Sequence, residues 1–123
     1  MMNVVALRGE LSRPAELRVL PTGSSLVALE VTTRRAGAAR ADTVPVVWHD
    51  APAAATNLDA GDEVVVVGHV ARRFFRAGGS TQSRTEVVAS AVIGVRSAKR
   101  IDAALREATA CIKAAIPRGR GSV

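Results

Sequence analysis

Short apolar segments of β type, each bounded by turn residues, fill the first 95 residues of the chain and restrict the folds that it can adopt. Val27, Leu29 and Val31 recur at every second position, which is the period of a strand with one buried face. Gly, Pro, Ser and Asp separate this segment from its neighbours. The expected elements are a strand over 3–11, a hairpin over 17–35 that counts as the second strand, and strands over 43–49, 63–75 and 84–95. Mainly β structure is therefore predicted.

A short helix is expected between the third and fourth strands. Residues 53–58 favour a helical turn, and Gly61 ends the segment. Five strands with a helix in this position follow the order of the OB-fold, a five-stranded Greek-key barrel whose face and loops commonly bind oligonucleotides. The predicted fold class is therefore an all-β OB-fold. Function has to be argued from particular residues, because a fold alone does not define it.

The apolar period lengthens to that of a helix near the C-terminus. Apolar residues recur at spacings of four and three, at Ile101, Leu105, Ala108, Ile112 and Ala115. We therefore expect an OB-fold domain over 1–96, followed over 97–123 by an amphipathic helix that Pro117 ends and by a short basic tail. Packing on its own domain or on a neighbouring subunit is the expected role of the helix. Docking of a different protein is the alternative.

The balance of charge favours an anionic partner. The net charge is +6 and the isoelectric point is near 11.2. Arg accounts for 15 of the 17 basic residues, and its guanidinium group suits phosphate, although a GC-rich genome would give the same bias. Residues 1–96 carry eleven Arg and nine acidic residues, a net charge of +2. A binding face on the predicted domain therefore requires local clustering of arginines.

Several functional classes are not supported by the residues present. Cys111 stands alone, so no intramolecular disulfide is expected, and we interpret it as a small packed side chain. No apolar run approaches the ~18 residues of a membrane span, so membrane contact is not expected. We expect a cytoplasmic protein. His49 and His69 lack a third ligand for a metal. With no phosphate-binding loop and no Ser placed beside a base, the chain is expected to be neither an enzyme nor a cofactor-binding protein.

The stretch from 70 to 88 contains the only two phenylalanines of the chain and four arginines, namely Arg72, Arg73, Arg76 and Arg84. Along a strand, Arg72 and Phe74 share one face, whereas Arg73 and Phe75 share the other. Bases of a single strand stack on exposed aromatic rings for ~1–3 kcal/mol each, and nearby cations bind the phosphates. One of the two rings is therefore a candidate stacking platform. The alternative is that both rings fill the core or a subunit contact.

Five segments of the chain form a pattern through their order and spacing, namely "VALRGELSRPAELR", "PTGSSLVALEV", "VPVVWHD", "LDAGDEVVVVGHVARRFF" and "TEVVASAVI". This pattern resembles the bacterial single-stranded-DNA-binding protein family. The resemblance covers about residues 3 to 93 and is most specific in the apolar run that ends at Gly68, the hairpin after it, and the following Thr-Glu-Val-Val.

This resemblance implies an OB-fold subunit of a homotetramer that wraps single-stranded DNA without sequence preference during replication, repair or recombination, and that associates with the nucleoid. By match to the family, Phe75 and, with a shift of one residue, Trp48 are base-stacking positions. Basic positions that contact DNA match Arg18, Arg72 and Arg73, and also Arg8 and Arg34. The predicted site is completed by the remaining residues of the hairpin and the loop after the second strand, namely Arg35, Phe74, Arg76 and Arg84.

The sequence also departs from the family pattern. The loop "TTRRAGAARAD" contains no aromatic residue, and Thr43 or Val44 stands where a second aromatic is usual, so two stacking positions are missing. Arg34, Arg35 and Arg40 give that loop a positive charge instead. The chain ends in "IPRGRGSV" rather than in an acidic tip, so recruitment of replication or repair proteins through such a tip is not expected. These differences indicate a secondary paralogue.

Two other functions stay open from the sequence. One is an OB-fold module that binds RNA or duplex DNA. The other is an interaction or structural protein with weak nucleic-acid binding that acts through its C-terminal helix.

Overall fold

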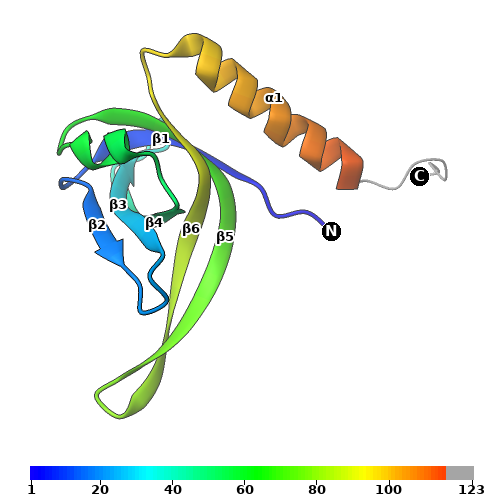
Figure 1. Cartoon of the computed structure of the whole chain (residues 1–123). Helices are drawn as coiled ribbons and strands as arrows, with labels where there is room; N and C mark the ends of the chain where they lie inside the picture. The colour runs from blue at the N-terminus through cyan, green and yellow to red at the C-terminus, as the bar shows by residue number, and fades with distance from the viewer. Residues whose placement is uncertain (116–123) are drawn as a thin grey trace.

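The computed structural model describes residues 1–115 and shows a β barrel with one long hairpin and one C-terminal helix (Figure 1). The predicted end of the helix at Pro117 and the basic tail lie outside the described residues. The elements are β1 (Val5–Leu11), β2 (Glu16–Val19), β3 (Ser25–Thr33), β4 (Asp42–His49), the 3-10 helix η1 (Ala53–Asn57), β5 (Glu63–Ala77), β6 (Ser80–Gly94) and α1 (Ala98–Ala115).

The six strands form one closed sheet. Their order is β1-β5-β6-β4-β3-β2, and a further pairing of β1 with β3 joins the ends of a five-stranded ring. β4 and β6 run parallel, with Val46 beside Val87, and the other pairs are antiparallel. The predicted OB-fold with a short helix between the third and fourth strands is confirmed. The one strand outside this ring, within residues 1–115, is β2, which pairs with β3. β2 is the first arm of the hairpin predicted over 17–35.

Aliphatic side chains fill the barrel because the chain has few aromatic residues. Val31, Val64 and Val66 are completely buried, and their alternation along β3 and β5 follows the period of two. Gly9 lies where β1 changes partner from β5 to β3, and a Cβ atom there would collide with the backbone carbonyl of Thr32. This close approach of the two backbones therefore requires a glycine at position 9.

The hairpin of β5 and β6 extends well beyond the barrel (Figure 1). Its turn is formed by Gly78 and Gly79, with φ angles of 59° and 83°, which is the left-handed pair that a two-residue turn between strands requires. Because Ala77 pairs with Ser80, both strands extend closer to the turn than the strands over 63–75 and 84–95 that the sequence predicts. Residues on both arms up to the turn therefore have a fixed register.

Helix α1 lies against the outer face of β5 and β6, at the end of the barrel remote from the hairpin turn (Figure 1). Ile101 and Leu105 line a hollow together with Leu7 and Val65. This arrangement agrees with the prediction that the helix packs on its own domain, and the division of the chain near residue 96 stays a prediction. No helix within residues 1–115 is both long and apolar enough to span a membrane.

Candidate nucleic-acid interface

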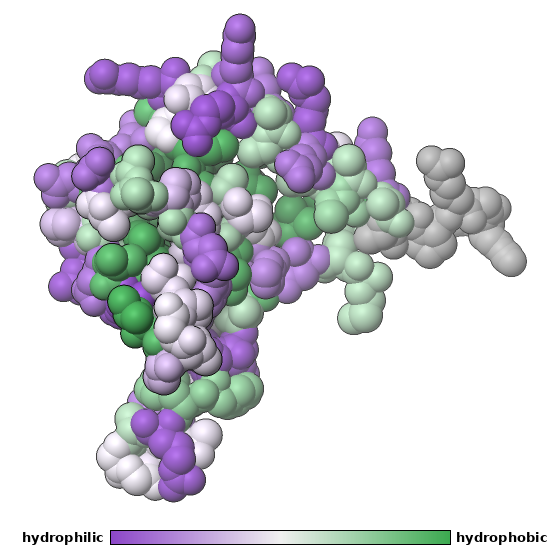
Figure 2. All heavy atoms as spheres, viewed as in Figure 1, coloured by the Kyte–Doolittle hydropathy of each residue, from purple (hydrophilic) through white to green (hydrophobic). Residues whose placement is uncertain are grey.

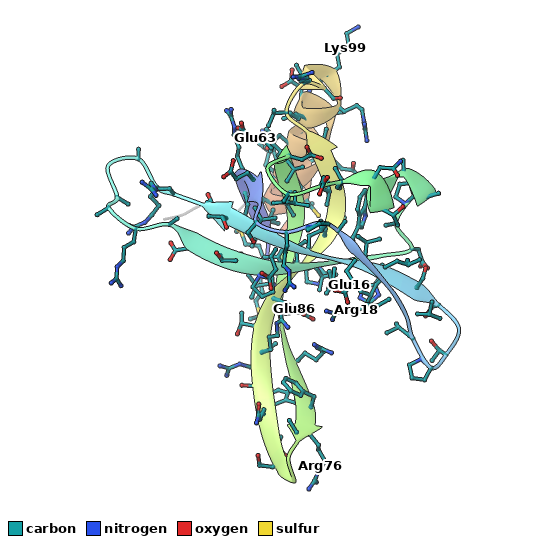
Figure 3. All side chains as sticks on the ribbon, turned by 90° about the vertical axis from the view of Figure 1, so that its left-hand side faces the viewer. Glu16, Arg18, Glu63, Arg76, Glu86 and Lys99 are labelled. Carbon is teal, nitrogen blue, oxygen red and sulfur yellow. The ribbon has the colours of Figure 1, made fainter. Side chains whose placement is uncertain are left out.

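A hollow crosses the outer face of the sheet over β2, β3, β4, β6 and the base of the β5–β6 hairpin. Its floor includes Ala28 and Val47, which pair with each other and alternate with core residues. Figure 3 shows Glu16, Arg18 and Glu86 gathered in this region. We name it the arginine groove and define it by its charged residues, Arg13, Glu16, Arg18, Glu30, Arg73, Arg84 and Glu86.

Glutamates pair with three of the four arginines in the groove, as judged from residues 1–115. The Arg18 Nε to Glu16 Oε1 distance is 2.9 Å, the Arg13–Glu30 pair spans 3.9 Å, and the Arg73–Glu86 pair spans 3.6 Å. The Arg13–Glu30 and Arg18–Glu16 pairs are exposed, and exposed pairs contribute only about 0–1 kcal/mol each. A phosphate can therefore replace either of these two carboxylates at little cost.

Glu86 and Arg84 give the groove its most constrained charges. The side chain of Glu86 is 7% exposed, and its contact with the half-exposed Arg73 supplies the positive charge that a buried carboxylate needs. Arg84 is half-buried and forms no ion pair with any residue of the described range. Its guanidinium is therefore free to bind an anion.

Phe75 extends the groove onto the hairpin. The guanidinium carbon of Arg73 lies 5.5 Å from the centre of the Phe75 ring, a cation–π distance. Arg84 pairs across the ladder with Arg73, and Gln82 pairs with Phe75, so all four side chains belong to one face of the hairpin. This face presents a half-buried ring next to two guanidinium groups.

Phe74 lies on the opposite face of the same strand, as the alternation predicts. Its side chain is 66% exposed. Arg72 and Arg76 share this face, and Arg76 lies near the hairpin turn (Figure 3). Neither phenylalanine belongs to the core cluster.

The remaining predicted residues lie elsewhere. Arg8 pairs with Glu63 at 2.6 Å and lines a second hollow with Arg34. Arg35 is exposed just after β3. Trp48 is half-buried and packs against the core cluster, because it shares its face of β4 with the buried Val46. The role of Trp48 in DNA binding stays a prediction, one that this geometry does not favour.

The sequence interpretation missed Arg13 and the three glutamates of the groove. Arg13 follows β1 in a segment without periodicity, so nothing local placed it on this face. The position of Glu86 depends on a register shift in the ladder of β5 and β6, where Val67 pairs with Ala91 and Gly68 with Ala89. The sequence signal that could have identified these glutamates is the occurrence of acidic residues on strands that face the arginines. Within residues 1–115, no three His, Cys, Asp or Glu side chains gather in a way that could hold a metal ion.

Comparisons with known proteins identify a family for this chain. The model of the single-strand binding protein family matches residues 2–94, about three quarters of the chain. No curated protein matches the chain.

Solved structures of single-stranded DNA binding proteins share the fold. The wild-type single-stranded DNA binding protein from Thermus aquaticus is 24% identical over 76% of this chain, with a TM-score of 0.61, and the chain spans 40% of its length. The Plasmodium falciparum SSB in complex with ssDNA is 19% identical over 77% of this chain and 96% of its own, with a TM-score of 0.66.

Proposed function

Because the chain belongs to the single-strand binding protein family, we propose that it binds single-stranded DNA without sequence preference through the arginine groove and Phe75. The observation that carries this proposal is the continuous face on which Arg73 lies 5.5 Å from the ring of Phe75 and Arg84 has no carboxylate partner within residues 1–115. Stacking and phosphate contacts do not depend on base identity, so such a face binds any sequence.

In this arrangement the ring of Phe75 binds bases and the guanidinium groups bind phosphates. A base that stacks on Phe75 contributes ~1–3 kcal/mol. Phosphates exchange with the exposed Glu16 for Arg18, whereas Arg73 keeps the buried Glu86 as its partner. Glu16 holds Arg18 over the groove when DNA is absent. A duplex cannot use the ring, because its bases are already paired and stacked.

Broader roles follow from the family and are part of the proposal. We infer a non-enzymatic protein that protects or organises single-stranded DNA in replication, repair or recombination, acts as a homotetramer, and works in the cytoplasm at the nucleoid. The solved Plasmodium falciparum SSB complex with ssDNA supports the choice of partner.

Fluorescence anisotropy of labelled oligo-dT with the wild type and with Phe75→Ala tests this function. We expect the substitution to weaken binding at least ~5-fold, the lower end of the stacking energy. Val19→Ala is the matched control, because Val19 is an exposed apolar residue of β2 on the face opposite Arg18. Oligo-rU and duplex DNA serve as competitors. Equal affinity of wild type and Phe75→Ala, or preference for duplex, would contradict the proposal.

A further inference from the structure

The face of the hairpin opposite Phe75 carries the exposed ring of Phe74, which does not pack in the core. We name it the outer hairpin face. It consists of alternate residues of β5 and their partners on β6, namely Val70, Arg72, Phe74, Arg76, Thr81, Ser83 and Thr85.

The barrel ends where this face begins. Val70 pairs with Val87, the last residue of β6 toward the turn that belongs to the core cluster, and Val70 itself is 41% exposed. Beyond this pair the hairpin projects from the barrel, so the side of the ribbon that would face the interior is in solvent (Figure 1). In the space-filling view the projecting lobe carries hydrophobic and strongly hydrophilic residues side by side (Figure 2).

The charge of the outer hairpin face is wholly positive. It has two arginines and no acidic residue, and the partners across the ladder carry hydroxyl groups. Arg72 forms no ion pair within residues 1–115, and Arg76 only donates a hydrogen bond of 3.3 Å to the carbonyl of Gly79. In the arginine groove, by contrast, three glutamates partly neutralise four arginines. The outer hairpin face is therefore the better match for a chain of phosphates.

We propose that the outer hairpin face is a second binding surface for single-stranded DNA, with Phe74 as a stacking platform between Arg72 and Arg76. This inference rests on the proposed function and extends it. Alternate residues of a strand lie about 6.6–6.8 Å apart, so ring and cations form a row along β5. Since Phe74 and Phe75 are adjacent and point to opposite sides, a strand that passes around the hairpin contacts both faces.

A second copy of the chain is a poorer occupant. In a two-fold interface the same patch meets itself, so the arginines of one copy would face those of the other without an acidic partner. Single-stranded DNA supplies both a flat apolar surface for Phe74 and negative charge for the arginines.

Tryptophan reporters distinguish the two faces. In a Trp48→Phe background, Phe74→Trp and Phe75→Trp each place the chain's one indole on one face. An oligo-dT longer than the ~16 nucleotides at the upper end of OB-fold sites should quench both variants. Val19→Trp, on β2, is the control and should stay unquenched.

Each outcome has a distinct meaning. Quenching of Phe75→Trp without quenching of Phe74→Trp overturns this inference and leaves the proposed function intact. Absence of binding by anisotropy in every variant and in the wild type overturns both. A change in Phe74→Trp fluorescence with protein concentration, without DNA, shows that a second copy covers the face and overturns the inference.

A salt titration adds a second readout. The double variant Arg72→Gln, Arg76→Gln should reduce the slope of log affinity against log salt by ~1.4, or ~0.7 for each phosphate that is no longer neutralised. Both side chains are exposed, so the thermal unfolding midpoint should not change. An unchanged slope contradicts the second surface.

Discussion

Arg73 has two contacts that relate stability to binding. Its Nε lies 3.6 Å from a carboxylate oxygen of Glu86, and its guanidinium lies over the ring of Phe75. Arg84, its partner across the ladder, has neither contact among the described residues. Two arginines on one face therefore differ in what they do for the folded protein in the absence of DNA.

We predict that Arg73→Ala lowers both the affinity for oligo-dT and the free energy of unfolding, the latter by ~1–3 kcal/mol, because it leaves the buried carboxylate of Glu86 without its cation. Arg84→Ala should lower the affinity and leave the free energy of unfolding within ~0.5 kcal/mol. Urea denaturation and anisotropy measure the two effects. Equal destabilisation by both substitutions would contradict the assigned difference.

Individual positions could be predicted from the sequence only where the pattern of one strand decides them. Phe74 and Phe75 are adjacent on a strand, so their opposite directions follow from the period of two. The direction of Trp48 depended on matching β4 to the family within one residue, and a shift of one residue exchanges the two faces of a strand. The match placed Trp48 with the DNA contacts, whereas the structure places it against the core.

At the scale of elements, the hairpin of β5 and β6 carries most of the candidate site. Its length, the turn at Gly78 and Gly79 and the strand order could be predicted, because strand periods and turn residues are local signals. The faces of β6 could not. The register shift beside Gly68 leaves Ser90 without a partner in the ladder and reverses the alternation along β6. An uninterrupted period of two from the buried Val92 would place Arg84 and Glu86 on the inner face of β6. The register shift places them on the outer face, in the groove.

Helix α1 is a second element whose role can be tested separately. We predict that Ile101→Ala lowers the free energy of unfolding by about 1–2 kcal/mol, less than the ~2–5 kcal/mol of a fully buried site, because Ile101 is half-buried beside Val65.

The same substitution should leave the affinity for oligo-dT unchanged, because α1 packs on the outer face of β5 and β6 and does not line the arginine groove. Lys99→Ala, an exposed residue of the same helix, is the control and should change neither quantity. A loss of affinity with Ile101→Ala would show that the helix takes part in DNA binding.

At the scale of the molecule, positive charge is concentrated around the hairpin, so the electrostatic potential there is more positive than the net charge of +6 suggests. Six arginines line the two sides of the hairpin and the adjoining groove, namely Arg13, Arg18, Arg72, Arg73, Arg76 and Arg84. The aromatic surface is small, since the loop between β3 and β4 has no aromatic residue. Binding energy therefore depends more on phosphate contacts than on stacking, and salt should weaken it strongly.

The most direct test of this account is the affinity of the wild-type protein for labelled oligo-dT across a range of salt concentrations. Five phosphate contacts per chain predict a slope of log affinity against log salt of about −3.5, or ~−0.7 for each contact. A slope shallower than about −1, or no binding at low salt, would contradict a surface of arginines that binds single-stranded DNA.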